Sequence, residues 1–234
     1  GTLIHTGDYK IDETPVIGNP YDLQTLKKIG DEGVLALLGD STNATIAGRT
    51  PSERDVIPAF EEIFENAEGR IFVSTFSSSL HRLQVVFDVA YEFKKKVCVL
   101  GRSLMKNVEI AEQLGLMRIP PDTMISLSDS RAFYGDDLVY LVTGSQGEPR
   151  AVLWNLASGT WKGMQIEKGD TVILSARIIP GNDRKISRLI GHLYKRGANI
   201  IEEKRRLIHV SGHASQEDIR ILTETVRPKY VVPI

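Results

Sequence analysis

The stretch LIHVSGHASQED, residues 207–218, decides how the chain is interpreted, because it joins a strand-like run to a turn and a helix start. Residues 207–210 predict a strand, and Ser215 followed by Asp218 predicts a capped helix start. His213 is therefore predicted on a strand-to-helix turn. Such turns line the ligand-binding edge of parallel sheets. An imidazole there can act as acid, base or metal ligand near neutral pH, or it can only hydrogen-bond a neighbouring backbone group.

The rest of the chain alternates between strand-like and helix-like patterns. Strands are predicted at 2–10, 33–40, 70–76, 96–100, 138–143, 171–175, 199–210 and 229–234. Helices are predicted at 20–30, 50–69, 80–93, 105–114, 149–157, 183–196 and 216–226, the second starting from Thr50 as N-cap. This alternation predicts an α/β fold with three layers, in which helices cover both faces of a mostly parallel, Rossmann-like sheet.

The composition excludes several classes of protein. The 29 basic and 30 acidic residues give a formal charge of -1, so any contact with nucleic acid must come from local groups of charge. A single cysteine, Cys98, lies in an apolar strand-like run, which excludes a disulfide framework and favours a reducing, cytoplasmic compartment. No apolar run has the length of a membrane span, and we expect no membrane partner.

Five polar loops follow predicted strands, at 39–43, 75–79, 143–149, 175–182 and 211–215. We expect them to open on one sheet edge, where helix N-termini offer N–H groups to phosphates. The same residue types are also ordinary turn and cap residues. No P-loop lysine and no Gly-x-Gly-x-x-Gly follows a strand, which disfavours a dinucleotide enzyme. The candidate phosphate-binding residues are Ser77, His81, Arg82, Gly144, Ser145, Gln146, Arg177, Ser211, Gly212 and Ser215.

Two aspartates lie at the ends of predicted strands. Asp8 lies in the Gly-Asp turn that ends the first strand, and Asp40 lies at the carboxyl end of the apolar run 33–40. An aspartate in a Gly-Asp turn is usually a turn residue, although a carboxylate at a strand end can also bind a metal. Neither His-x-His nor Glu-x-x-His occurs in the chain. The residues alone therefore do not predict a complete metal site.

Six short motifs occur in a fixed order: HTGDYK (5–10), GDSTN (39–43), FSSSLHRLQ (76–84), TGSQGEP (143–149), IPGN (179–182) and HVSGHA (209–214). Together they resemble the ribonuclease J family, which has a metallo-β-lactamase fold with an inserted β-CASP domain. The resemblance covers essentially the whole chain. It implies a β-CASP domain at 49–205, flanked by metallo-β-lactamase segments at 1–48 and 206–234.

The resemblance also implies an activity and residue roles. It implies a two-zinc RNA phosphodiesterase that cleaves endonucleolytically and from 5′-monophosphorylated ends, in a cytoplasmic homo-oligomer. Asp8 matches the family's metal-bridging aspartate. His213 matches the histidine of the family's Ser-Gly-His motif, which acts as the general acid, and Asp40 matches the acid that orients this histidine. Ser211 and the 144–148 loop match the surface that holds RNA phosphates.

The family's other metal-binding histidines have no counterpart among residues 1–234. The chain opens and ends in strand-like segments, and we expect it to be part of a larger protein that, by itself, binds zinc poorly and does not cleave RNA. Two alternatives stay open. One is a non-catalytic RNA-binding or scaffold β-CASP module, and the other is a nucleotide-binding α/β domain, supported only by the generic sheet edge.

Overall fold

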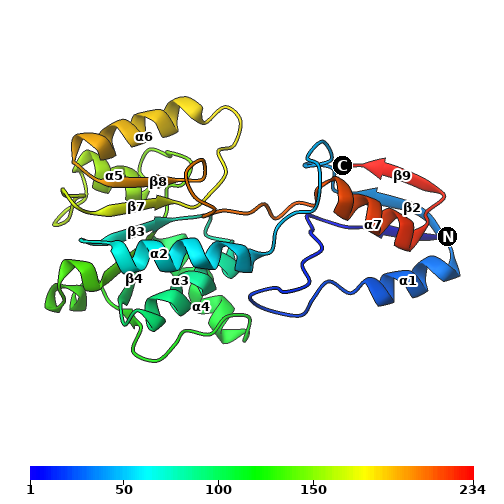
Figure 1. The fold of residues 1–234 in the computed structure, drawn as a ribbon, viewed down its shortest axis with the longest axis horizontal. Helices are drawn as coiled ribbons and strands as arrows, with labels where there is room; N and C mark the ends of the chain where they lie inside the picture. The colour runs from blue at the N-terminus through cyan, green and yellow to red at the C-terminus, as the bar shows by residue number, and fades with distance from the viewer. The chain divides into compact units, whose positions relative to one another are not determined.

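The computed structural model describes all residues, 1–234, and contains two parallel sheets in two compact units. Unit 1 comprises Gly1–Arg54 and Val210–Ile234, and unit 2 comprises Asp55–His209 (Figure 1). Unit 2 is thus inserted into unit 1. The predicted domain limits, 48/49 and 205/206, lie a few residues before these two crossings. None of the helices combines the length and apolar character that a membrane span requires.

Unit 2 is a three-layer α/β/α domain, as the alternation of patterns predicts. Its six parallel strands have the order β5-β4-β6-β3-β7-β8. Helices α2, α3 and α4 cover one face of the sheet, and α5 and α6 cover the other (Figure 1). The strands are β3 (Ile71–Ser74), β4 (Lys96–Leu100), β5 (Met124–Ile125), β6 (Leu138–Val142), β7 (Thr171–Leu174) and β8 (Asn199–Glu202). The helices are α2 (Ile57–Asn66), α3 (Leu80–Glu92), α4 (Arg102–Gln113), α5 (Val152–Ser158) and α6 (Asp183–Lys195), with 3-10 turns at Glu53–Val56, Asp129–Ala132 and Gly135–Asp137.

The core of unit 2 lies on both sides of this sheet, because its central strands are apolar on both faces. All residues of β3 and β6 are buried, as expected for strands covered by helices on two sides. Phe72 of β3 stacks on Tyr140 of β6 with ring centroids 4.9 Å apart. Each fully buried large apolar side chain contributes about 1.5–3 kcal/mol to stability. The apolar core around this sheet is therefore the main stabilising element of unit 2.

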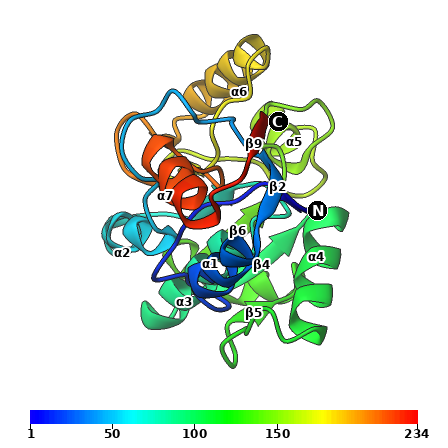
Figure 2. The same cartoon turned by 90° about the vertical axis from the view of Figure 1, so that its right-hand side faces the viewer.

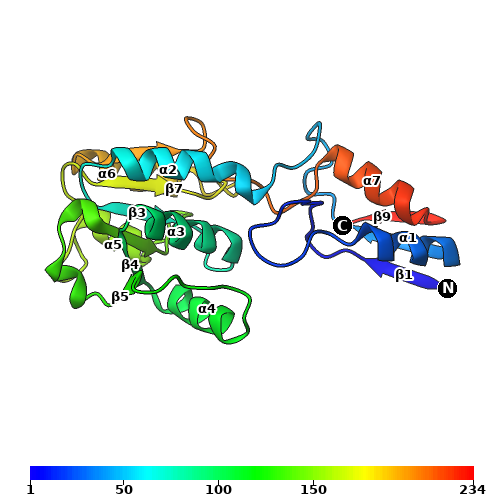
Figure 3. The ribbon, with the colours of Figure 1, turned by 60° about the horizontal axis from the view of Figure 1, so that its bottom comes forward.

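Unit 1 contains a three-stranded parallel sheet built from both ends of the chain. The strand order is β1 (Thr2–His5), β2 (Val34–Gly39), β9 (Tyr230–Pro233). Helices α1 (Leu23–Glu32) and α7 (Gln216–Val226) pack against each other and against β2 (Figures 2 and 3). Gly30 of α1 allows this close packing, since a Cβ there would lie 2.8 Å from the carbonyl oxygens of Thr225 and Val226.

Three predictions about local structure are wrong. The strand predicted at 199–210 ends at Glu202, and residues 207–210 form no strand. Thr50 is not a helix N-cap, because α2 begins only at Ile57 after a 3-10 turn, and its hydroxyl is bonded to the backbone of His213 instead. The five polar loops do not share one sheet edge: those at 39–43 and 211–215 belong to unit 1, and the other three belong to unit 2.

Candidate functional site

Asp8, Asp40 and His213 come together in unit 1. One potential ligand atom from each residue lies within 4.8 Å of the others. Asp40 is buried, His213 is partly buried and Asp8 is exposed. The Nδ1 atom of His213 lies 2.8 Å from Oδ2 of Asp40. Two carboxylates and an imidazole therefore meet, although His213 follows Asp40 by 173 residues.

The parallel pairing of β1 with β2 brings the two aspartates to the same end of the sheet. His5 pairs with Leu38, so the turns that follow the two strands lie side by side. The backbone N–H of Asp40 donates to Thr6 Oγ1 at 3.0 Å, which joins these turns directly. Gly7 adopts a φ of +58° in the first turn, a conformation that glycine accepts without strain.

The loop that carries His213 is held from several sides. The Ser211 hydroxyl accepts from the His213 N–H at 3.1 Å and from Asn43 Nδ2 at 2.9 Å. Thr50 Oγ1 donates to the His213 carbonyl at 2.7 Å. Immediately after the loop, Ser215 and Asp218 form the predicted capping box of α7. The position of His213 is thus fixed through backbone and neighbouring side chains as well as through its ring.

Asn43, Thr50 and Asp218 support the site and were missed as site residues by sequence reasoning. Asn43 lies in the GDSTN motif, which could have identified it. Asp218 is fully buried and accepts from the backbone N–H groups of Thr50 and Ser215 at 2.8 and 3.3 Å. The capping pattern predicts the contact of Asp218 with Ser215. The bonds of Thr50 with Asp218 and His213 join residues more than 160 positions apart, which no local pattern shows.

The Asp40 carboxylate is held in its charged form. Burial disfavours this charge, but hydrogen bonds from the Thr42 backbone and side chain and from His213, with the attraction of the imidazolium, outweigh burial and lower the pKa of Asp40. The ionised Asp40 accepts Nδ1–H of His213, so Nε2 is the ring nitrogen left for acid–base chemistry. This tautomer is assigned from the hydrogen bond.

These three residues do not complete a metal centre. A catalytic zinc ion takes three protein ligands and a water molecule. Asp40 and His213 are hydrogen-bonded to each other, and Asp40 Oδ1 also accepts a hydrogen bond from Thr42 N–H at 3.0 Å. Only the exposed Asp8 carboxylate makes no hydrogen bond or ion pair within the chain. The donor set fits one edge of a divalent-metal site, with Asp8 as the available ligand.

The predicted phosphate-binding residues fall into two groups. Ser211, Gly212 and Ser215 lie beside His213 in unit 1, where Gly212 is exposed and Ser215 is buried. The others lie in unit 2, at the carboxyl ends of β3, β6 and β7; they are Ser77, His81, Arg82, Gly144, Ser145, Gln146 and Arg177.

Several of these unit 2 residues have structural partners. Gln146 is buried, donates to the Arg177 carbonyl at 2.9 Å and accepts from Ile179 N–H at 2.9 Å, so it joins the loops after β6 and β7. Gly144 has a φ of +115°. Ser77 and His81 are partly buried, and the Arg177 side chain is exposed.

Arg82 lies in the interior, contrary to a role as a surface phosphate ligand. Its side chain is 1% exposed and donates to Ser175 Oγ and to the Ile208 carbonyl. Ser175 also donates to the Ile208 carbonyl at 2.6 Å. Arg82 therefore holds the last part of unit 2 against the end of β7.

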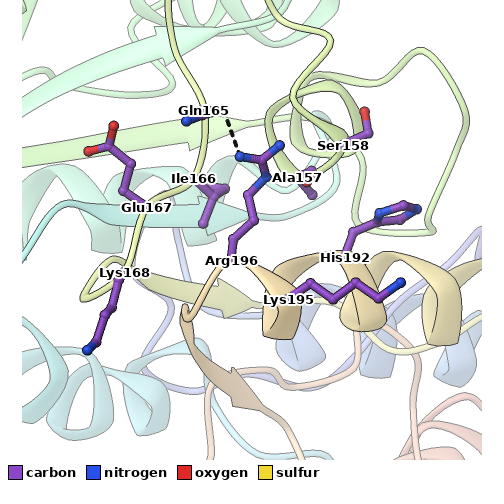
Figure 4. Close-up of a pocket in the computed structure, with 9 residues that line it drawn as sticks. All are labelled: Ala157, Ser158, Gln165, Ile166, Glu167, Lys168, His192, Lys195 and Arg196. Carbon is purple, nitrogen blue, oxygen red and sulfur yellow. Dashed lines mark hydrogen bonds between the residues drawn. The ribbon is translucent and has the colours of Figure 1, made fainter.

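A pocket of about 460 Å³ lies elsewhere in unit 2, between the ends of α5 and α6 and the segment before β7 (Figure 4). None of the predicted site residues lines it. Arg196 extends from the end of α6 between Gln165 and Ala157, to which its Nη1 and Nε donate at 2.7 Å each (Figure 4).

Comparison with known proteins identifies a family. Residues 68–193, more than half of the chain, match the family model described as "Ribonuclease J, beta-CASP domain". Over all 234 residues the chain is 43% identical to a protein named Ribonuclease J from Synechocystis sp. and 39% identical to one from Helicobacter pylori, of which it covers 37% and 34%. It is 40% identical over 233 residues to Ribonuclease J of Thermus thermophilus, covering 40% of that protein. The chain spans about a third to two fifths of these relatives, and it belongs to the ribonuclease J family, whose β-CASP domain it contains.

Proposed function

We propose that this chain supplies the β-CASP domain and the general-acid histidine of a ribonuclease J-type RNA phosphodiesterase. The observation that carries the proposal is the Asp40–His213 pair beside the Asp8 carboxylate. A carboxylate that orients an imidazole, next to a carboxylate available for a metal, suits hydrolysis of a phosphodiester. The family membership of the chain and the names of its relatives support RNA as the substrate.

In this proposal His213 protonates the leaving group. Water adds to the phosphorus and releases a proton to solvent, while the bond from phosphorus to the leaving ribose oxygen breaks and that oxygen takes the proton from Nε2 of His213. Solvent then returns a proton to Nε2. Asp40 keeps Nδ1 protonated and stabilises the charged ring before the transfer. Ser211 and Gly212 lie next to His213, where hydroxyl and backbone N–H groups can bind phosphate oxygens.

A divalent metal ion, which we propose to be zinc in a two-ion centre, would supply electrostatic stabilisation of the phosphate charge. Asp8 is the residue of this chain that would bind it. The remaining ligands are proposed to come from other parts of the full-length protein. We further propose endonucleolytic cleavage, 5′-to-3′ degradation of 5′-monophosphorylated RNA, a homo-oligomeric assembly and a cytoplasmic location for that protein.

The test compares His213→Ala and Asp40→Asn with His209→Gln in the full-length protein. Cleavage of 5′-monophosphorylated RNA is measured at saturating substrate, together with bound metal by elemental analysis. We expect His213→Ala to lower the cleavage rate by about 10²–10⁴-fold with metal content unchanged, as for loss of a general acid, and His209→Gln to have little effect. Unchanged cleavage in His213→Ala would exclude the general-acid role. A wild-type protein that binds RNA without cleaving it would favour the scaffold alternative.

A further inference from the structure

After Asp183, the first residue of α6, every charged side chain on the exposed face of this helix is positive. Arg184, Lys185, Arg188 and Lys195 are exposed, and the opposite face is buried through Ile186, Leu189 and Leu193. At 100° per residue, Arg184, Arg188 and Lys195 lie within about 40° of one another around the helix axis. None of these three cations forms an ion pair or hydrogen bond within the chain. We call the face defined by Arg184, Arg188 and Lys195 the basic face of α6.

A glycine lies at the edge of the basic face, between Arg188 and Lys195 along the helix axis. Gly191 comes one turn after Arg188 and one turn before Lys195, inside a 13-residue helix. Glycine is a poor helix former, yet no packing requirement explains it here. Its φ is not positive, and a Cβ at this position would meet no atom within 4 Å. A glycine without a structural requirement lets another backbone approach the helix closely.

The pocket shown in Figure 4 lies at the C-terminal end of the basic face. Lys168, Lys195 and Arg196 line it together with one carboxylate, that of Glu167, so positive charge predominates in a concave surface of about 460 Å³. The His192 ring meets the Trp154 ring edge-on at 5.5 Å between centroids, which holds the imidazole at the rim. The pocket therefore extends the surface that a ligand on the basic face can contact.

We propose that the basic face of α6 and this pocket form a second RNA-binding surface, which contacts backbone phosphates of single-stranded RNA. The choice of RNA rests on the proposed function. Arg184 and Arg188 are separated by about 6 Å along the helix, and guanidinium groups bind phosphates bidentately. An acidic protein suits this surface less well as a partner than RNA does. Protein interfaces have an apolar centre, but the only large exposed apolar side chain of α6, Tyr194, lies beside the basic face and not on it.

The first test measures RNA binding by the full-length protein in EDTA, so that RNA is not cleaved. The probe is a fluorescein-labelled single-stranded RNA of about 20 nucleotides with a 5′-hydroxyl, followed by anisotropy at several salt concentrations. We expect Arg188→Ala/Lys195→Ala to weaken binding about tenfold and to reduce the salt slope by about 1.4, since each phosphate contact to a single strand contributes about 0.7. The matched control is Arg102→Ala/Lys106→Ala on α4, which removes two exposed cations from another helix of unit 2.

The second test uses Gly191→Gln, which adds an uncharged, good helix former to the basic face. We expect a higher Tm together with weaker RNA binding, a combination that a purely structural glycine would not give. Binding by Gly191→Gln and by Arg188→Ala/Lys195→Ala equal to that of the α4 control would overturn the proposal. Displacement of the RNA by poly-glutamate at equal charge concentration would overturn the assignment to RNA.

Cleavage assays distinguish this inference from the proposed function. If the wild type cleaves RNA but Arg188→Ala/Lys195→Ala binds it as the control does, only the second surface is refuted. If the wild type neither binds nor cleaves RNA, both proposals fail. If both hold, the double variant binds RNA more weakly in EDTA and keeps the wild-type kcat at saturating RNA.

Discussion

Removal of the Asp218 carboxylate is expected to loosen the loop that carries His213. Asp218 is fully buried at the start of α7, and its Oδ2 accepts from the N–H groups of Thr50 and Ser215. Asp218→Ala leaves both buried N–H groups without a partner, which costs about 1–3 kcal/mol each. The ion pair with Arg49, 3.2 Å away, contributes less than about 1 kcal/mol because that side chain is 39% exposed. We therefore expect a loss of about 3–5 kcal/mol in the free energy of unfolding of unit 1.

Asp218→Asn separates these contributions. An amide whose oxygen replaces Oδ2 keeps the acceptor for Thr50 and Ser215. Its NH2 group replaces Oδ1 and cannot accept from Arg49 Nε, so both the hydrogen bond and the ion pair to Arg49 are lost. We expect this variant to lose about 1–2 kcal/mol. Glu217→Ala is the control. It removes a carboxylate from the same helix turn, and its ion pair with the exposed Arg220 contributes little to stability.

The assay is urea unfolding followed by far-ultraviolet circular dichroism, with amide hydrogen exchange to locate the effect. In Asp218→Ala we expect faster exchange at Thr50, Ser215 and the first turn of α7, with unit 2 amides unchanged. Equal stability of the Ala and Asn variants, or protection retained at Thr50, would refute the assignment of Asp218 as the acceptor that fixes this loop.

Three further predictions concern other parts of the chain. Burial raises the pKa of the Cys98 thiol to about 11, so we expect it not to react with Ellman's reagent at pH 8 until the protein is unfolded; rapid reaction in native buffer would contradict the burial. Burial disfavours the charged Asp12 carboxylate, but hydrogen bonds from Thr14, Ser52 and Glu53 and the charge of Lys10 outweigh burial and lower the pKa of Asp12. The contribution of Asp12 to stability is therefore present above about pH 4 and is lost as the pH falls through the folded-state pKa. Urea midpoints measured from pH 7 to pH 3 should therefore fall less steeply for Asp12→Asn than for the wild type, and equal slopes would contradict the linkage. Gly144→Ala should destabilise unit 2 by about 1–3 kcal/mol, because φ is +115° and the new Cβ would lie 2.9 Å from Cβ of Ala151. Gly191→Ala adds a Cβ in open space on a helix and should stabilise unit 2 by up to about 1 kcal/mol. Urea unfolding measures both changes.

The regular elements could be predicted from sequence because their signals are local. The strand Lys96–Leu100 and the helix Gln216–Val226 appear at the predicted positions, the first from an apolar run and the second from its capping box. The separate sheet of unit 1 follows only from the family resemblance, which implies flanking metallo-β-lactamase segments. Local patterns cannot show it, because pairing between distant strands, such as β2 with β9, leaves no local signal. The strand predicted through residue 210 failed for a related reason: the Ile208 carbonyl accepts from Arg82 and Ser175 instead of a neighbouring strand.

The candidate site was predicted in part. Asp40 and His213 were paired through the family resemblance, and the 2.8 Å contact between them shows that the two groups meet. The prediction for Arg82 is wrong because an arginine near a helix start usually faces solvent, whereas its burial here depends on partners 93 and 126 residues away. Gln146 was selected for its loop, but the sequence could not show that its amide is occupied by the Arg177 and Ile179 backbone.

The hydrogen bonds around His213 also explain how unit 1 can contain an insertion of this size. The chain leaves unit 1 after Arg54 and returns at Val210. Thr50, just before the first crossing, is bonded to the His213 carbonyl and to Ser215, just after the second. These bonds lie wholly within unit 1 and hold both crossing points on the unit 1 side. Since loop-closure entropy rises only slowly with length, the size of the insertion matters little once its two ends are held. The clamp at Thr50 thereby also fixes the loop that places His213 beside Asp40.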